Sequence, residues 1–255
     1  MTVGVVILCS DGIVVASDSL ATFSRGAPVA RNKNKVHIIR HDNLRHPIAL
    51  VGAGMSAFID KFIDRAKREG IIHASQELNK KLDIVDFVEN VGESICLLLL
   101  KQYVIDRSQF FGSPVNDYSL SLVAAGATMD GEMRCYHIHG SGLAESIEGY
   151  GTVGSGAAYA ELFLHGFLPE PDKVNVDEAV KVACYAIKGA EIMDPNVGGD
   201  ARLCKLVMSG DQLIAEYVHR RSIPHSAKAK IEQVLQKIGE EMKEIVANTS
   251  SPQSP

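Results

Sequence analysis

A threonine directly after the initiator methionine is the first residue of this sequence that could do chemistry. Removal of Met1 would leave Thr2 with a free α-amine beside its hydroxyl. The hydroxyl can then act as a nucleophile and the amine as its base, directly or through a water, because an unperturbed α-amine has a pKa of about 7.7–8.0. A small second residue permits removal of Met1. Many proteins begin Met-Thr, however, so these two residues alone do not identify an enzyme.

Asp18 is the second candidate, because this carboxylate closes an apolar Ile-Val-Val-Ala-Ser run. Burying it unpaired would cost more than the roughly 1–3 kcal/mol of a neutral polar group, so it needs a cation. The first basic cluster downstream consists of Arg31, Lys33 and Lys35. A buried Lys35 ammonium near Thr2 would lower the pKa of the hydroxyl, with Asp18 holding the ammonium charged. The alternative is a solvated run of charges.

Three glycine-rich segments could position backbone groups at a site. Gly52-Ala53-Gly54 ends an apolar run and precedes a helical pattern, where free N–H groups can bind an oxyanion. Such clusters usually only turn the chain. Gly154-Ser155-Gly156 and the segment from Asp194 to Gly199 are also tight turns beside helix ends, and the residues alone favour a structural role for each.

His137 and His139 share one face of a predicted strand and could bind a metal. A metal site needs a third ligand, and no third ligand or glutamate is spaced to join them. We therefore interpret the two histidines as a solvent-facing or packed pair and not as metal ligands.

The elements that must position Thr2 and Asp18 form a predicted β-hairpin. Two apolar runs, Val3 to Leu8 and Ile13 to Val15, are joined across Ser10-Asp11-Gly12. With a turn of two, three or four residues, Thr2 falls opposite a position between Ser19 and Ala21. Asp18 is therefore only a short step along the strand from the partner of Thr2.

The rest of the chain alternates between groups of strands and pairs of helices. The predicted strands are Val36 to Arg40, Pro47 to Val51, Ser119 to Thr128, Glu132 to Ile138, Glu145 to Ile147, Gly151 to Val153, and a closing hairpin of Leu203 to Met208 and Leu213 to Val218. The predicted helices are Met55 to Arg68 with Gly70 as its stop, Leu82 to Leu100 with Asp83 as N-cap, Ser155 to His165, and a helix through Ile192 opened by a capping box of Asn175 and Glu178.

This order predicts an α+β fold with segregated layers, in which two sheets face each other and helix pairs lie outside. Residues 19–34 and 110–116 are predicted loops. After Pro224, Ala227 to Ala247 has the pattern of an amphipathic helix, and Asn248 to Pro255 is polar enough to be disordered. We therefore divide the chain into a main domain, residues 1–223, and a C-terminal extension, residues 224–255.

Composition, charge and cysteine spacing argue against several classes of partner and location. The formal net charge of −5 over 255 residues gives no electrostatic reason to expect nucleic acid or an anionic membrane. No apolar run approaches the ~20 residues of a membrane span, and the start lacks the pattern of a signal peptide. The five cysteines are scattered without C-x-x-C spacing, which favours buried thiols in a reducing compartment. We expect a cytoplasmic protein.

Several motifs together carry a family resemblance: TVGVV…DGIVVASDSxAT, NKVHII, AGMSA, VGSGAAYA and DPNVGG. In this order, from Thr2 to about Val218, the chain resembles the proteasome β-type subunits and their bacterial relatives, which are N-terminal-nucleophile (Ntn) threonine peptidases. The resemblance implies a four-layer αββα sandwich without a metal or organic cofactor. It also implies peptide or polypeptide substrates, a homo-oligomeric ring, and an unfoldase or α-type ring as a candidate partner.

By position within these motifs, the resemblance assigns roles to six residues. Thr2 matches the nucleophile, Asp18 and Lys35 match the charged pair beside it, and Gly54 matches the amide of the oxyanion hole. Ser155 and Asp194 match the residues that hydrogen-bond around the threonine amine.

Three features depart from the family pattern. Val197 stands where active members usually carry a serine that helps to position the amine, which removes one hydrogen bond worth about 0.5–1.5 kcal/mol. Only Met1 precedes Thr2, where many members carry longer propeptides. The helical tail after Pro224 exceeds the usual end of the family, and we expect it to dock on its own body or on a ring neighbour.

The leading hypothesis is therefore a threonine-type endopeptidase. Two alternatives stay open at this point. One is a catalytically silent, structural member of the fold, which the presence of Val197 favours and the retained Thr2, Asp18 and Lys35 disfavour. The other is an Ntn enzyme that hydrolyses other amides or joins peptides by transfer to an amine, for which the same residues would serve.

Overall fold

The structure is a computed structural model, and it describes residues 2–22, 28–30, 33–106, 109, 119–168, 170–218, 233 and 236. The predicted loop at 110–116 and the predicted disordered end at 248–255 lie outside the described residues. So does the predicted tail helix at 227–247, apart from residues 233 and 236. The docking expected for that tail stays a prediction.

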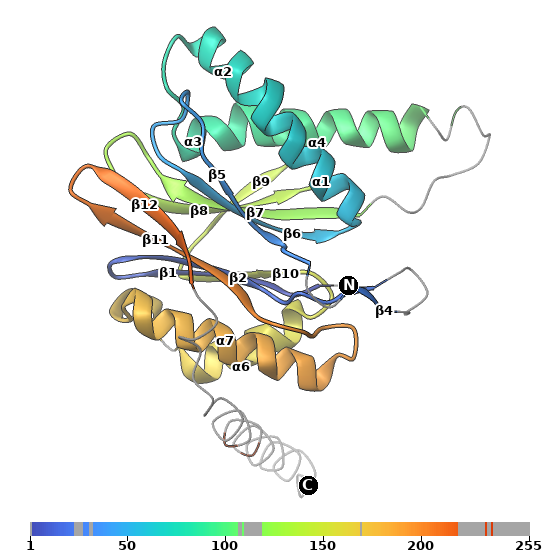
Figure 1. Cartoon of the computed structure of the whole chain (residues 1–255), viewed down its shortest axis with the longest axis vertical. Coiled ribbons are helices and arrows are strands. Elements are labelled where there is room, and N and C mark those ends of the chain that lie inside the picture. Colours follow the sequence, from blue (N-terminus) through green and yellow to red (C-terminus); the bar gives the residue numbers. More distant parts are fainter. Residues whose placement is uncertain are drawn as a thin grey trace, which may run out of the picture.

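Two five-stranded antiparallel sheets form the centre of the molecule (Figure 1). The first has the order β10-β1-β2-β11-β12, with bounds β1 Gly4–Cys9, β2 Gly12–Ser17, β10 Tyr150–Val153, β11 Arg202–Ser209 and β12 Gln212–Tyr217. The second has the order β5-β6-β7-β8-β9, with bounds β5 Val36–Ile39, β6 Ile48–Gly54, β7 Leu120–Ala127, β8 Met133–His139 and β9 Ala144–Ile147.

Helices cover the outer face of each sheet, so the layers run helix, sheet, sheet, helix (Figure 1). One layer contains α1 Ser56–Arg65, η1 Ala66–Gly70, α2 Ile71–Leu78, α3 Ile84–Phe87, η2 Val88–Gly92, α4 Glu93–Leu100 and η3 Lys101–Ile105. The other contains α6 Ala157–Phe167 and α7 Val176–Met193, with the short helix η4 Pro171–Lys173 between them in the chain. The predicted four-layer αββα sandwich is confirmed.

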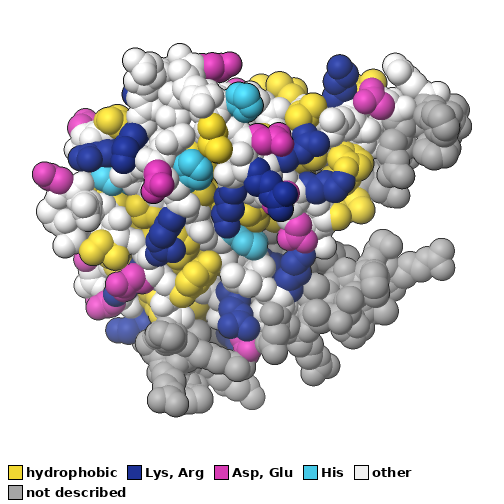
Figure 2. Space-filling model, turned by 45° about the horizontal axis from the view of Figure 1, so that its top comes forward, with side chains coloured by type: hydrophobic (Ala, Val, Ile, Leu, Met, Phe, Trp, Pro, Cys, Tyr) yellow, Lys and Arg dark blue, Asp and Glu magenta, His cyan; other side chains and the backbone are white. Residues whose placement is uncertain are grey.

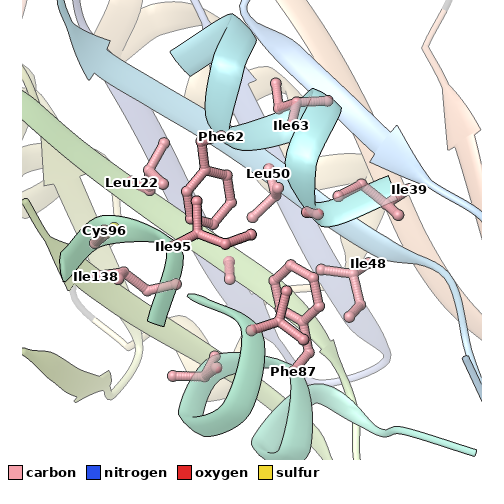
Figure 3. Packing of buried hydrophobic residues seen from close by; sticks show 14 of the residues in the cluster. Ile39, Ile48, Leu50, Phe62, Ile63, Phe87, Ile95, Cys96, Leu122 and Ile138 are labelled. Atoms are coloured by element: carbon pink, nitrogen blue, oxygen red, sulfur yellow. The ribbon is translucent and has the colours of Figure 1, made fainter. Parts of the chain in front are cut away.

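Three apolar clusters hold these layers together, one at each interface between them. One lies between the first sheet and α6 and α7, and a second lies between the two sheets. The third packs α1 to α4 on the second sheet, where Phe62 and Phe87 point into the cluster with Leu50 and Leu122 beneath them (Figure 3). Strands buried on both faces explain the nearly continuous apolar runs of β1, β2 and β6.

The prediction that Gly70 ends the first helix was wrong. The helical rod continues through η1 and α2 and ends at Asn79, which has the left-handed φ of 50°. A β-carbon placed on Gly70 would lie only 2.9 Å from Val91 Cγ1, so this glycine allows two helical rods to pack closely. The second rod also runs past the predicted end at Leu100, as far as Ile105.

Two predicted N-caps, Asp83 and Asn175, are confirmed, whereas α6 begins at Ala157 and not at the predicted Ser155. The Asp83 carboxylate accepts a hydrogen bond from the Asp86 N–H, and the Asp86 carboxylate accepts one from the Asp83 N–H, which completes a capping box. The Asn175 side chain accepts from the Glu178 N–H at the start of α7, which is the N-cap half of the predicted capping box; the hydrogen bonds described for this pair do not include the return bond to the Glu178 side chain. Helix α7 ends at Met193, directly before the predicted break.

The prediction that residues 19–34 form only a loop was wrong in part. The segment contains two short strands, β3 Ala21–Thr22 and β4 Pro28–Ala30, which pair with each other. Strands of two and three residues are too short to show the period-2 alternation by which a strand is recognised in a sequence.

The surface over the α1–α4 layer carries charges of both signs, with apolar side chains between them (Figure 2). Among the helices that the structure describes, none is long and apolar enough to cross a membrane. All five cysteines are buried thiols, as the sequence predicts.

Candidate active site

The hairpin of β1 and β2 brings Asp18 beside the start of the chain. Cys9 pairs with Gly12, so the turn has two residues, the shortest of the lengths that the sequence allows. The same register pairs Gly4 with Ser17, and continuing it places Val3 opposite Asp18 and Thr2 opposite Ser19. The Val3 N–H donates to Asp18 Oδ1 at 3.0 Å, and the Asp18 N–H donates to the Val3 carbonyl at 3.2 Å.

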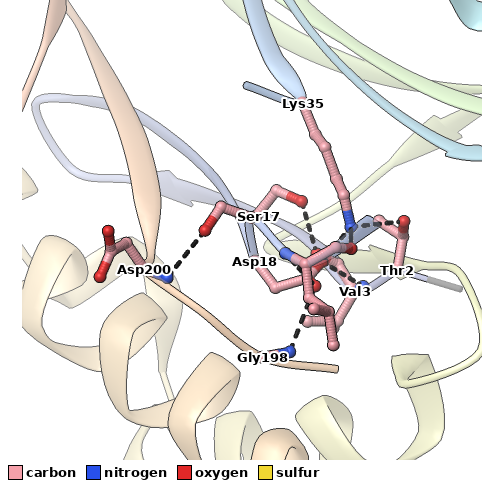
Figure 4. Close-up of polar contacts among 9 residues, drawn as sticks. Thr2, Val3, Ser17, Asp18, Lys35, Gly198 and Asp200 are labelled. Atoms are coloured by element: carbon pink, nitrogen blue, oxygen red, sulfur yellow. Dashed lines mark hydrogen bonds and ion pairs between the residues drawn. The ribbon is translucent and has the colours of Figure 1, made fainter. Parts of the chain in front are cut away.

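The Asp18 carboxylate is fully buried, and both of its oxygens accept hydrogen bonds (Figure 4). Oδ1 accepts from Val3 and from Lys35 Nζ, the latter at 2.8 Å. Oδ2 accepts from the backbone N–H groups of Leu20 and Gly198, at 3.2 and 3.3 Å. The Lys35 ammonium therefore supplies the cation that this buried carboxylate requires.

Lys35 reaches this point from the start of β5 in the second sheet (Figure 4). Its Nζ lies 2.8 Å from Thr2 Oγ1, 2.8 Å from Asp18 Oδ1 and 2.6 Å from the Leu20 carbonyl. These three oxygens match the three N–H groups of an ammonium. Of the other two cations in the basic cluster, Lys33 pairs instead with Asp60 at 3.1 Å, and residue 31 lies outside the described residues.

Burial lowers the pKa of Lys35 below its ordinary value, and Lys33 adds to this effect, while the charge and hydrogen bond of Asp18 oppose it. The Lys35 side chain is only 7% exposed, so its interactions with Thr2 are little screened by water. An ammonium in this position can orient the Thr2 hydroxyl and stabilise negative charge that develops on its oxygen.

Gly54 lies at the end of β6, which runs three residues beyond the predicted strand end at Val51. Its φ is 109°, and a β-carbon there would lie 2.2 Å from the Ser119 carbonyl oxygen, so the position requires glycine. The preceding residue, Ala53, is close to the start of the chain: a β-carbon placed on Gly154 would lie 3.2 Å from Ala53 Cβ and 2.1 Å from the Thr2 carbonyl oxygen. Gly54 thus follows the part of β6 that approaches Thr2.

Ser155 and Asp194 lie in the two turns that flank this region. Ser155 is exposed in the turn before α6, and the next residue, Gly156, donates its N–H to the Thr2 carbonyl at 3.3 Å. Asp194 is 8% exposed and directly follows α7. The hydrogen bonds described for its carboxylate come from the backbone and side-chain nitrogens of Asn196, at 2.9 and 3.0 Å. Contacts of Ser155 or Asp194 with a threonine amine therefore stay a prediction.

Val197 is buried against the turn that precedes α6. A β-carbon on Gly156 would lie 2.7 Å from Val197 Cγ2 and 3.1 Å from Val3 Cβ. The valine thus packs directly behind the residues that hold Thr2, where a serine would present a hydroxyl instead.

Sequence reasoning missed the backbone groups of the site and one hydroxyl. The Leu20 carbonyl and the Gly198 N–H complete the contacts of Lys35 and Asp18, and the Ser17 hydroxyl donates to the Val3 carbonyl at 2.8 Å. Every non-proline residue has an N–H and a carbonyl, so residue type carries no signal for the first two. For Ser17, its place directly before Asp18 was the available signal.

Sequence reasoning also missed a glutamate that lies beside His137 and His139. Strand β9 pairs with β8 and places Glu145 directly opposite His137. One donor atom of each of these three residues lies within 4.8 Å of the other two. Spacing along the chain did not show this, because Glu145 lies on a neighbouring strand.

The comparisons with known proteins agree with this geometry at the level of a family. The model of a family described as proteasome subunit matches residues 2–205, a range that contains Thr2 and the other five candidate residues. No curated protein matches the chain.

Proposed function

The chain belongs to the proteasome subunit family, and on that basis we propose that it is a threonine-type endopeptidase with Thr2 as its nucleophile. The observation that carries the proposal is the contact between Lys35 Nζ and Thr2 Oγ1 at 2.8 Å, with buried Asp18 beside the same ammonium. A scaffold protein has no need of a buried ion pair against the hydroxyl of residue 2, and breaking such a pair is costly.

The first half of the proposed reaction forms an ester. Cleavage of the Met1–Thr2 bond frees the α-amine of Thr2, which takes the proton from Oγ1 as this oxygen attacks the scissile carbonyl. The Lys35 ammonium stabilises the charge on Oγ1, and the Gly54 N–H donates to the oxyanion. The tetrahedral intermediate then collapses, the scissile C–N bond breaks, and the ammonium of Thr2 protonates the departing amine.

The second half releases the acyl group. A water loses its proton to the Thr2 amine and attacks the ester carbonyl, and the proton returns to Oγ1 as the ester C–O bond breaks. In this scheme Ser155 and Asp194 orient the amine. Val197 lacks the hydroxyl that would help them, which predicts a slower enzyme rather than an inactive one.

Threonine is a better candidate for the nucleophile than any cysteine of this chain. Burial raises the pKa values of Cys9, Cys96, Cys184 and Cys204 to about 12, so their thiolates are scarce near neutral pH. Cys135 is fully buried, and its pKa is raised further. A maleimide is therefore expected to leave the activity of the folded protein unchanged.

The proposal includes assembly into a homo-oligomeric ring that degrades peptides or polypeptides in the cytoplasm. Family membership supports a ring-forming subunit. The described surface offers apolar side chains for such contacts: Leu97, Leu98 and Ile105 are exposed on α4 and η3, and Leu162, Ile192 and Met193 are exposed on α6 and α7. An unfoldase or an α-type ring stays an expected partner, and buried thiols support the cytoplasmic location.

A second candidate function, that of a silent structural subunit, is favoured by one observation. Val197 fills the position of the amine-orienting serine with a buried apolar side chain.

An Ntn amidohydrolase or transpeptidase would use the same residues as the peptidase, and a substrate profile with peptides and small amides separates these activities.

The test is the intact mass of the purified protein before and after incubation with a peptide epoxyketone, which reacts with both the amine and the hydroxyl of an N-terminal threonine. We expect loss of Met1 and one adduct, with hydrolysis of fluorogenic peptides. Thr2→Ala should lose Met1 and form no adduct, and Thr152→Ala, a change at a threonine on β10, should be labelled normally. Loss of Met1 without an adduct or hydrolysis in the unmodified sequence would establish the silent subunit instead.

A further inference from the structure

His137, His139 and Glu145 bring three metal-binding side chains to one face of the second sheet. The two histidines lie two residues apart on β8, so they share a face, and their ring centroids are 4.0 Å apart. Glu145 pairs with His137 from β9, and its Oε2 lies 3.5 Å from His139 Nε2. The group combines two imidazoles with one carboxylate, which is a donor set that suits divalent transition metals.

The distances between the three donor atoms fit a metal ion of the size of zinc if the donor atoms move slightly closer together. Nitrogen and oxygen ligands about 2.0–2.1 Å from a tetrahedral Zn²⁺ lie about 3.4 Å from one another. Glu145 Oε2 and His139 Nε2 are 3.5 Å apart, and all three donor atoms lie within 4.8 Å of one another. The Glu145 side chain is 72% exposed, so rotation of its carboxylate can make the remaining adjustment without repacking the core.

The unsatisfied ring nitrogen of His139 is a second, independent indication of a metal site. This ring nitrogen is buried, yet it has no hydrogen-bond partner among the atoms that the structure describes. Its distance of 3.5 Å to Glu145 Oε2 is too long for a good hydrogen bond. A buried polar atom without a partner costs free energy, and a metal ion held between this nitrogen and the carboxylate would satisfy both groups.

Ser121 holds the ring of His137 in place from the neighbouring strand. Its Oγ lies 2.6 Å from His137 Nε2. In known metal sites, a hydrogen bond to one nitrogen of a histidine orients the ring and directs the other nitrogen to the metal. The His137 ring is thus held by a partner of the kind that metal-binding histidines usually have.

The cluster lies on the inner face of the second sheet. His137 shares its face with Cys135, which belongs to the apolar cluster between the sheets. Ser121, which pairs with His139, also pairs with Ala53 of β6, so the cluster stands at the end of the sheet that approaches Thr2. Two strand spacings of about 4.8 Å separate β6 from β8.

From these contacts we propose that His137, His139 and Glu145 bind one divalent transition-metal ion, with Zn²⁺ as the natural occupant. Three protein ligands leave one position of a tetrahedral ion open to water or to another ligand. The site does not depend on the peptidase proposal, because none of its residues takes part in that reaction.

The test is a titration of the full chain, free of any affinity tag and stripped with a chelator. Co²⁺ serves as the optical probe, Zn²⁺ as the competitor, and elemental analysis gives the stoichiometry. We expect one equivalent of Co²⁺ with the intense visible absorption of a tetrahedral site, displaced by Zn²⁺. His139→Ala and Glu145→Gln should each weaken binding at least 10-fold, and Ser121→Ala about 10-fold.

The matched control is His73→Ala, which removes an exposed histidine of α2 and should leave binding unchanged. Glu145→Gln keeps the test decisive if a histidine variant fails to fold, because its side chain is largely exposed. Absence of stoichiometric binding would overturn the proposal. So would equal affinity in the unmodified protein and in Glu145→Gln, since binding would then be adventitious.

Discussion

Lys35 Nζ lies 2.8 Å from Asp18 Oδ1 and 2.8 Å from Thr2 Oγ1, so a single ammonium joins the second sheet to the hairpin of the first. The same contact has a structural and a chemical consequence. It neutralises a carboxylate that is completely buried, and it places a positive charge against the hydroxyl of Thr2. Variants at these two positions can separate the two consequences.

Asp18→Asn should lower the free energy of unfolding by about 3 kcal/mol, because Lys35 would stay buried without a counter-charge. Urea denaturation at neutral pH measures the change. Replacing the cation as well, in Asp18→Asn/Lys35→Met, should recover part of the lost stability while epoxyketone labelling of Thr2 stays absent. If the free energy of unfolding of Asp18→Asn were within about 1 kcal/mol of that of the unmodified protein, the ion pair would contribute little to the fold.

Val197→Ser should speed the labelling of Thr2 roughly 2- to 10-fold, because the new hydroxyl can donate or accept one hydrogen bond near the amine. The rate of adduct formation, followed by intact mass, measures the effect. Val197→Ala is the matched control, since it removes apolar volume from the same buried position and adds no hydroxyl. If serine labels no faster than alanine, the departure at Val197 does not limit the reaction.

Protonation of His46 should lower the stability of the fold in mild acid. Its Nδ1 accepts a hydrogen bond from the Leu213 N–H at 3.3 Å, which requires that nitrogen to be unprotonated. Burial lowers the pKa of His46 below its ordinary value of 6.5, with Arg45 acting in the same direction and Asp83 opposing. The folded state therefore binds fewer protons than the unfolded state between the folded pKa and 6.5, and the free energy of unfolding rises with pH over that window.

This contribution is complete above pH 6.5 and is lost as the pH falls through the folded pKa of His46. Between pH 7 and pH 5, the unmodified protein should lose about 1 kcal/mol more than His46→Asn, which keeps an acceptor but does not titrate in this range. Urea denaturation at both pH values provides the measurement. Parallel losses in the two proteins would rule out His46 as the titrating group.

Gly189→Ala should destabilise the protein by about 2–3 kcal/mol, although alanine is the better helix former. A β-carbon there would lie 2.2 Å from Phe163 Cε2, inside the contact between α7 and α6. Thermal unfolding gives the size of the effect. In the Phe163→Leu background the same substitution should cost much less, and an equal cost in both backgrounds would locate the strain elsewhere.

Much of the fold and part of the candidate site can be read from local patterns. The Val and Ile runs on either side of Ser10-Asp11-Gly12 predict the hairpin. The hairpin alone is enough to place Asp18 near Thr2. Asp83 and Asn175 mark helix starts, because a capping side chain bonds only to the backbone two or three residues ahead. Such signals depend on neighbours in the chain, so they survive in the sequence alone.

Other features depend on partners far along the chain, and only the tertiary structure decided them. Which cation pairs with Asp18 depends on how the second sheet packs on the first, and this packing selects Lys35 while Lys33 pairs with Asp60. Gly70 resembles a helix stop in the sequence. In the structure the helix continues past it, and glycine is needed there because a β-carbon would lie 2.9 Å from Val91 Cγ1 of the second helical rod. Glu145 joins His137 and His139 only through strand pairing. Residue types record backbone preference and burial, whereas the register between strands and the packing of layers determine which distant side chains meet.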